Sequence, residues 1–211
     1  ILRGTGNMAA LLANLRNTLI VSFILALVMI YAYATASGYG FSDVRTWQAI
    51  LRWVHIFFGI LWIGLLYYFN FVQARKMPEI PAELKPGISK FIAPEALFWF
   101  RWGAMGTVIA GLILAWLNNY LVQALTLGAV ENFANPKNTL MGIGMWLALI
   151  MFFNVWGVIW PKQKIALGLV EADADAKAKA ALIAGQFSRI NTLLSLPMLV
   201  AMGMTQTLFG S

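Results

Sequence analysis

Five long apolar stretches, separated by shorter polar segments, run along the 211-residue chain. Their lengths approach or exceed the roughly 20 residues that a helix needs to cross about 30 Å of hydrocarbon. Short strands of alternating polarity, which are typical of transmembrane β-barrels, are absent. The pattern predicts an all-α integral membrane protein: one membrane domain, residues 1–211, built as a bundle of about five transmembrane helices. The predicted spans are residues 18–36, 47–73, 95–120, 138–160 and 188–209.

Two polar segments outside these spans also have helical patterns. In residues 165–187 the acidic residues come first, and Asp173 and Asp175 are each followed four residues later by a lysine. This arrangement suits both the helix dipole and ion pairing between successive turns. We expect a cytoplasmic helical extension there, and a short interfacial helix before the first span.

The basic residues are distributed unevenly between the segments that join the spans. One set of segments is rich in them: Arg3 and Arg16; Arg75, Lys76, Lys85 and Lys90; Lys162, Lys164, Lys177 and Lys179. The alternate loops carry few: Arg45, Arg52 and Lys137. By the positive-inside rule, the N-terminus is expected in the cytoplasm and the C-terminus outside. The chain would then be a multi-pass membrane protein.

Composition narrows the classes of function. Hydrophobic residues make up 61% of the chain and charged residues 11%, so the lipid bilayer is its expected surrounding. The absence of cysteine excludes disulfides, iron–sulfur clusters and covalently attached c-type haem. The net charge of +7 is explained by the membrane-flanking loops, so nucleic acid is not expected as a partner.

The single histidine, His55, lies within the second predicted span. On a helix, Arg52, His55, Gly59 and Trp62 fall on one stripe. An ionisable ring in a membrane helix needs a reason, and haem b is one, because neutral imidazole is a good iron ligand. Under this hypothesis His55 binds the haem iron, Gly59 leaves room for the porphyrin, and Arg52 pairs with a propionate.

The second axial ligand cannot be another histidine of this chain. The outer halves of the fourth and fifth spans hold four methionines that could complete a His/Met site: Met141, Met145, Met202 and Met204. The alternative is that the methionines fill the core, that His55 hydrogen-bonds at the membrane boundary, and that the glycines only allow close helix packing. No set of carboxylates or further histidines indicates another metal, and no other cofactor is expected.

A second group of polar residues lies near the opposite ends of the predicted spans. Its members are Arg101 in the third span, Asn154 in the fourth, and Arg189, Asn191 and Ser195 in the fifth. Such residues face one another rather than lipid. Two interpretations remain open: hydrogen bonds that join the helices, or a small-molecule pocket.

Three stretches together resemble a known family: RWVHIFFGILWIGLLYYFNF (52–71), NVWGVIWPKQK (154–164) and RINTLLSLPML (189–199). They are similar to the membrane domain of bacterial membrane-bound urate hydroxylases, the urate oxidase N-terminal domain family, over about residues 47–205. The resemblance implies a location in a bacterial inner membrane. In that family a C-terminal c-type cytochrome domain takes electrons from urate oxidation. This sequence has no C-x-x-C-H motif, so the resemblance implies a separate cytochrome c.

These observations give a leading hypothesis and two alternatives. The leading one is a membrane subunit that binds haem b and transfers electrons to a separate cytochrome c. The first alternative is a non-enzymatic accessory or scaffold subunit bound to other membrane subunits. The second is a homo-oligomeric channel or small-solute transporter, which the absence of paired intramembrane carboxylates and of an evident inverted repeat disfavours. No catalytic residue is assigned.

Overall fold

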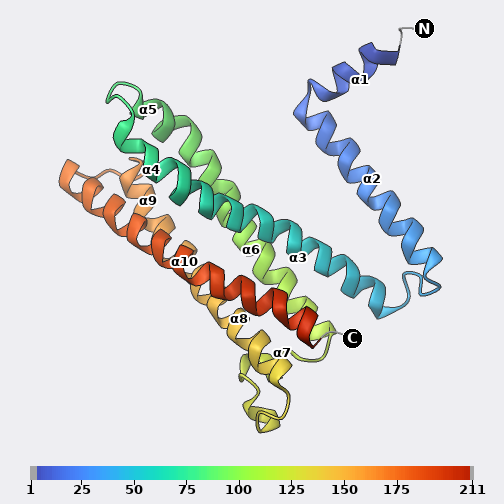
Figure 1. The fold of residues 1–211 in the computed structure, drawn as a ribbon. Coiled ribbons are helices and arrows are strands. Elements are labelled where there is room, and N and C mark those ends of the chain that lie inside the picture. The colour runs from blue at the N-terminus through green and yellow to red at the C-terminus, as the bar shows by residue number, and fades with distance from the viewer. Residues whose placement is uncertain (1–3, 210–211) are drawn as a thin grey trace. The chain divides into compact units, whose positions relative to one another are not determined.

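The computed structural model describes residues 4–209, with side chains from Met8 onward. Arg3, one of the basic residues used for the predicted orientation, lies outside the described residues. Within the described part the chain is helical and has no strand (Figure 1). Five of its helices are long and apolar enough to cross a membrane: Leu15–Ala36, Val44–Glu79, Lys85–Leu117, Pro136–Ala166 and Ala174–Leu208. The predicted all-α membrane architecture is confirmed.

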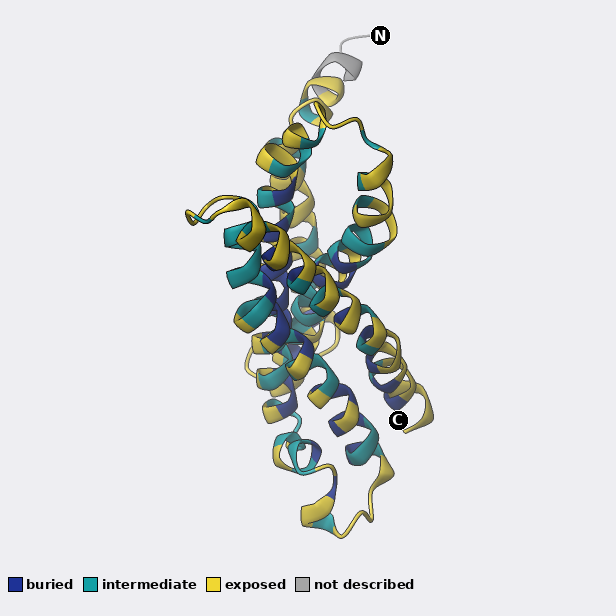
Figure 2. Cartoon of the chain, turned by 90° about the vertical axis from the view of Figure 1, so that its left-hand side faces the viewer, coloured by how far each residue is buried: buried dark blue, intermediate teal, exposed yellow. Residues whose placement is uncertain are grey.

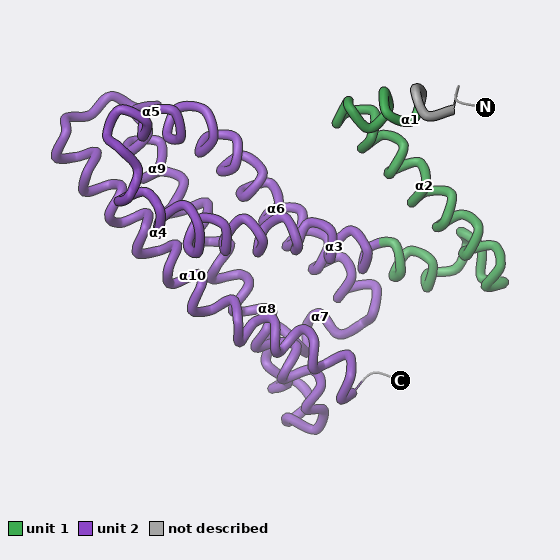
Figure 3. Tube along the Cα trace, turned by 45° about the horizontal axis from the view of Figure 1, so that its top comes forward, with its two compact units in different colours: residues 1–50 green, residues 51–211 purple. Residues whose placement is uncertain are grey.

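The chain divides into two compact units, residues 1–50 and residues 51–211 (Figure 3). In the first unit, helix α1 (Gly4–Leu12) is followed by α2 (Leu15–Ala36). Asn14 separates them in an extended conformation and accepts a hydrogen bond from the Asn17 N–H at 3.3 Å. This is an N-cap, which explains why α2 begins there.

The second unit is built mainly from α3 (Val44–Tyr67, from residue 51 onward), α6 (Ala93–Leu117), α8 (Pro136–Phe153) and α10 (Ala174–Leu208). Buried residues lie along the inner faces of these helices (Figure 2). The core includes Trp62 and Leu66 from α3, Phe100 from α6 and Met151 from α8, each at most 2% exposed.

Small residues bring the helices of this unit close together. A Cβ atom added at Gly103 of α6 would lie 3.1 Å from the backbone nitrogen of Trp62 on α3. One added at Gly106 would lie 2.5 Å from Phe58 Cγ. Between α8 and α10, a Cβ at Gly144 would lie 3.0 Å from that of Ala201. Close backbone approach through small residues is a characteristic of membrane helix pairs.

Three π-helical segments widen the long helices: η1 (Tyr68–Gln73), η3 (Ile88–Ile92) and η5 (Asn154–Ile159). The last two directly precede α6 and α9 (Trp160–Ala166), each of which has a proline at its second residue. Proline lacks an N–H and crowds the preceding turn, and a wider turn accommodates both effects. The fourth span, expected to end at residue 160, therefore continues as helix to Ala166.

Short helical turns complete the connections. Between η1 and η3 lie α4 (Ala74–Lys76), η2 (Met77–Glu79) and α5 (Lys85–Gly87). Between α6 and α8 lie α7 (Leu121–Leu125) and η4 (Ala129–Glu131). A Cβ atom added at Gly142 of α8 would clash with the backbone carbonyl of Ala124, so the glycine lets α7 pack directly onto α8.

Helix α10 is a single 35-residue helix. Asp173 caps it, because its side chain accepts a hydrogen bond from the Ala176 N–H at 2.7 Å. The polar residues from 174 to 187 and the last apolar span thus belong to one continuous element, with Pro197 inside it.

Candidate functional site

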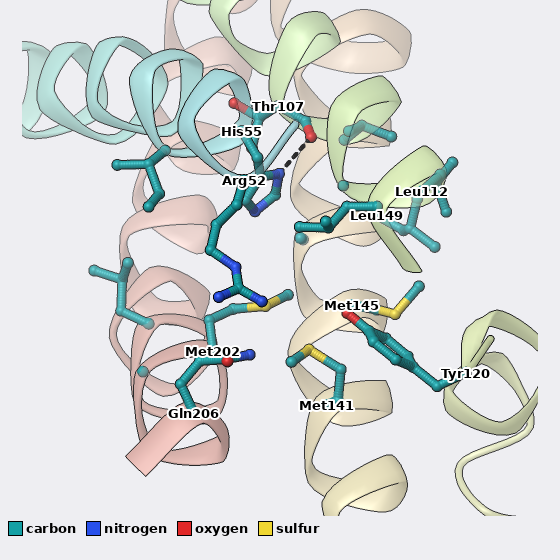
Figure 4. A pocket seen from close by; sticks show the side chains of 17 residues that line it. Arg52, His55, Thr107, Leu112, Tyr120, Met141, Met145, Leu149, Met202 and Gln206 are labelled. Carbon is teal, nitrogen blue, oxygen red and sulfur yellow. Dashed lines mark hydrogen bonds between the residues drawn. The ribbon is translucent and has the colours of Figure 1, made fainter. Parts of the chain in front are cut away.

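A pocket of about 380 Å³ lies among α3, α6, α8 and α10 (Figure 4). Its size falls within the range of roughly 300–1,000 Å³ that is usual for small-molecule sites. Most of the lining is aliphatic or thioether, and the polar side chains come from Arg52, His55, Thr107, Tyr120 and Gln206. An apolar pocket with a few convergent polar groups is the usual form of a ligand site.

His55 is held in this pocket by the backbone of α6. Its Nδ1 atom lies 2.8 Å from the carbonyl oxygen of Thr107, shown as a dashed line in Figure 4. A carbonyl can only accept, so Nδ1 carries the hydrogen and donates it. In the neutral ring Nε2 then keeps its lone pair. Histidines that bind metals are usually oriented in this way, with the second ring nitrogen donating to a carbonyl or carboxylate.

The absence of a side chain at Gly111 leaves the space that the His55 ring occupies. A Cβ atom added at Gly111 would lie 2.8 Å from both Nδ1 and Cε1 of His55, a distance that real Cβ contacts do not reach. Gly111 and Thr107 are one turn apart on α6, so one short stretch of helix both contacts and hydrogen-bonds the ring. The sequence interpretation missed Gly111, because a glycine inside an apolar span indicates helix packing but not its partner.

Arg52 and Tyr120 form the charged and aromatic end of the pocket. Arg52 lies almost one turn before His55 on α3, and Tyr120 lies in the turn after α6. Burial raises the pKa of the Tyr120 phenol, and the positive charge of Arg52 opposes this to a smaller extent. The phenol is therefore neutral at physiological pH and keeps its hydrogen as a donor.

Three of the four candidate methionines line the pocket. Met141 and Met145 come from α8 and are buried, and Met202 comes from α10 and is partly buried (Figure 4). Met204 is 45% exposed and does not line it. Thioethers from two helices thus share a pocket with the imidazole of a third.

The other two residues of the predicted stripe lie elsewhere. Trp62 is fully buried in the core and does not line the pocket. Gly59 faces α6, where a Cβ would meet Thr107 Cγ2 at 3.9 Å, an ordinary van der Waals distance. The structure thus brings Arg52 and His55 together in the pocket and places Gly59 and Trp62 in the packing between α3 and α6.

Three residues of the predicted polar group form hydrogen bonds between helices. Asn154 donates to the Asn191 side-chain oxygen at 2.8 Å, and Asn191 donates to the carbonyl of Met151 at 3.0 Å. Ser195 Oγ lies 3.0 Å from the hydroxyl of Tyr67 on α3. These contacts join α3, α8 with η5, and α10.

The two arginines of the predicted polar group, Arg101 and Arg189, do not take part in these hydrogen bonds between helices. Arg101 is only 8% exposed, and its guanidinium carbon lies 3.4 Å from the centroid of the Trp160 ring. This cation–π contact supplies part of the compensation that a buried charge needs. Its Nε and Nη1 atoms have no hydrogen-bond partner among the described residues. Arg189 is exposed on α10.

A comparison with protein families finds a match over part of the chain. Residues 114–206 match the family described as urate oxidase N-terminal, which confirms the predicted resemblance over those residues. The match contains the second and third motif stretches and the pocket walls from α8 and α10. The first stretch, with Arg52 and His55, precedes it. No curated protein and no solved structure matches the chain.

Proposed function

From the similarity of residues 114–206 to the urate oxidase N-terminal family and from the membrane-spanning bundle, we propose an electron-transfer subunit of a bacterial inner membrane. In this proposal the chain binds haem b at His55 and delivers electrons to a cytochrome c. The observation that carries it is the hydrogen bond from His55 Nδ1 to the Thr107 carbonyl, because that bond leaves Nε2 available for iron.

The residues of the pocket fit a haem in their chemistry. The imidazole supplies one axial ligand, and Met141, Met145 or Met202 would supply a second. Arg52 provides a guanidinium for a propionate. Haem bound there would supply reversible one-electron transfer.

The protein's own residues determine how such a site behaves. The Thr107 carbonyl fixes the His55 tautomer and makes the imidazole a stronger base, and Gly111 fixes the position of the ring. The aliphatic lining of α6, α8 and α10 keeps water away, and the methionines favour the reduced state if one of them is a ligand.

Absorption spectra of the purified protein, expressed with an adequate haem supply, test the proposal. The expected reduced-minus-oxidised spectrum has a b-type α-band that is lost in His55→Ala. Added imidazole should restore part of the band in His55→Gly. Ile60→Ala, at a site 68% exposed on the same helix, is the matched control and should keep the full band.

Two results would overturn the proposal. One is purified protein without haem absorbance, and the other is a haem spectrum that His55→Ala leaves unchanged. A haem-free protein that co-purifies in fixed ratio with a larger membrane complex would instead support the accessory-subunit hypothesis.

A further inference from the structure

A second, smaller pocket of about 140 Å³ adjoins the His55 pocket. The two are lined in common by Arg52, Leu114, Tyr120, Met141 and Gln206, so they are neighbouring parts of one hollow. The larger part is mainly apolar. The smaller part, which we call the neck, adds the polar residues Asn118, Lys137, Asn138 and Thr205.

Two positively charged side chains that are far apart in the sequence, Arg52 and Lys137, both line the neck. Arg52 comes from α3, and Lys137 comes from the first turn of α8. Lys137 Nζ donates to the backbone carbonyl of Phe209 at 3.0 Å, which is a neutral acceptor. Among the described residues neither cation forms an ion pair. The N-terminal end of α8 adds the positive end of a helix dipole.

One carboxylate lies close to the neck but is already engaged. Glu131 Oε2 accepts a hydrogen bond from the buried Asn138 side chain at 2.7 Å. Glu131 itself does not line the neck. Two other polar residues of the neck also donate within the protein, Asn118 to the Leu114 carbonyl and Thr205 to the Ala201 carbonyl. The surface that the neck offers to a ligand is therefore cationic, and its donors include Arg52, Lys137 and the neutral Tyr120 phenol.

We propose that the neck binds the carboxylates of an amphipathic acid whose apolar body fills the larger pocket, and that Lys137 is a binding residue alongside Arg52. This rests on the proposed function, in which the acid is haem b and the carboxylates are its propionates. Charge-assisted hydrogen bonds to these groups orient the molecule in the hollow and favour the acid over its neutral ester.

The test compares haem with haem dimethyl ester, in which both propionates are masked. Haem-free protein in detergent is titrated with each, and binding is followed by absorbance. Wild-type protein should bind haem about tenfold or more tightly than the ester, as expected for hydrogen bonds between charged groups. Lys137→Met should weaken haem binding, leave ester binding almost unchanged, and so reduce the preference.

Two control variants distinguish loss of the charge in the neck from a general effect of the substitution on folding. Lys137→Arg retains the charge and should retain the preference. Lys162→Met removes a lysine of similar partial burial that lies on α9, outside both pockets, and should also retain it.

The outcomes separate the two proposals. Equal affinities of wild-type protein for haem and ester, or an unchanged preference in Lys137→Met, would overturn the role of the neck while haem binding at His55 stood. Absence of binding by either molecule would overturn the proposed function and the neck with it.

Discussion

The imidazole of His55 on α3 lies against the backbone of Gly111 on α6, with no room for a Cβ between them. The Thr107 carbonyl, one turn earlier on α6, receives the hydrogen of the same ring. Two consecutive turns of one helix thus determine where the only imidazole of the chain lies and which of its nitrogens is free.

The first prediction compares two glycines at the contact between α3 and α6, Gly59 on α3 and Gly111 on α6. Gly111→Ala should displace the His55 ring at a cost of about 1–3 kcal/mol, and so lower haem affinity roughly tenfold. Gly59→Ala should bind haem as wild type does, because its new Cβ would meet Thr107 Cγ2 at 3.9 Å. Haem titration of both variants checks this. Equal losses in the two would contradict the assignment of Gly111 to the ring.

The second prediction concerns the methionine that would be the second axial ligand of the proposed haem. Leucine is similar to methionine in volume but cannot bind iron, so replacing the ligand should lower the midpoint potential of the haem. We expect this at one of Met141, Met145 and Met202, measured by redox titration. Met204→Leu, at an exposed site outside the pocket, is the control. If all three pocket variants keep the wild-type potential, the second ligand is not a methionine of this pocket.

The third prediction concerns the hydrogen bonds around Asn191, which is fully buried. Asn191→Leu leaves the Asn154 side-chain amide without its partner and removes one of the two donors to the Met151 carbonyl, so it should destabilise the protein by about 1–3 kcal/mol. The double variant with Asn154→Leu should recover part of this loss, since it removes the stranded amide. Unfolding in mixed detergent micelles measures both. Additive losses would show that the two amides are not coupled.

The fourth prediction follows from the raised pKa of Tyr120. A pKa that is higher in the folded state means that the neutral phenol is favoured by folding. The corresponding stability is complete below the unfolded pKa of about 10 and is lost as pH rises through the folded value. Ultraviolet titration should show a late step in tyrosine ionisation, and Tyr120→Phe should remove that step. A late step that survives this substitution would assign it to another tyrosine.

The sequence determined those features that depend on lipid as the solvent. An unbroken apolar run must be a helix there, because every backbone polar group has to be satisfied within the segment. The five spans and the all-α class could therefore be predicted from residue order. The end of the fourth span was predicted too early, because the widened turn before Pro161 lets the helix continue. The family resemblance came separately, from the motif stretches. The candidates His55, Arg52 and three of the four methionines also proved to share one pocket.

Only the tertiary structure decided which side chains meet. Helical spacing placed Gly59 and Trp62 on one stripe with His55. In the structure, however, Gly59 packs against α6 and Trp62 lies in the core, so only the part of the stripe with Arg52 and His55 lines the pocket. Gly111, Thr107 and Lys137 come from other helices, and no period along α3 could indicate them. Residue order fixes the helices through their own backbone hydrogen bonds, whereas the pocket depends on how closely separate helices approach one another.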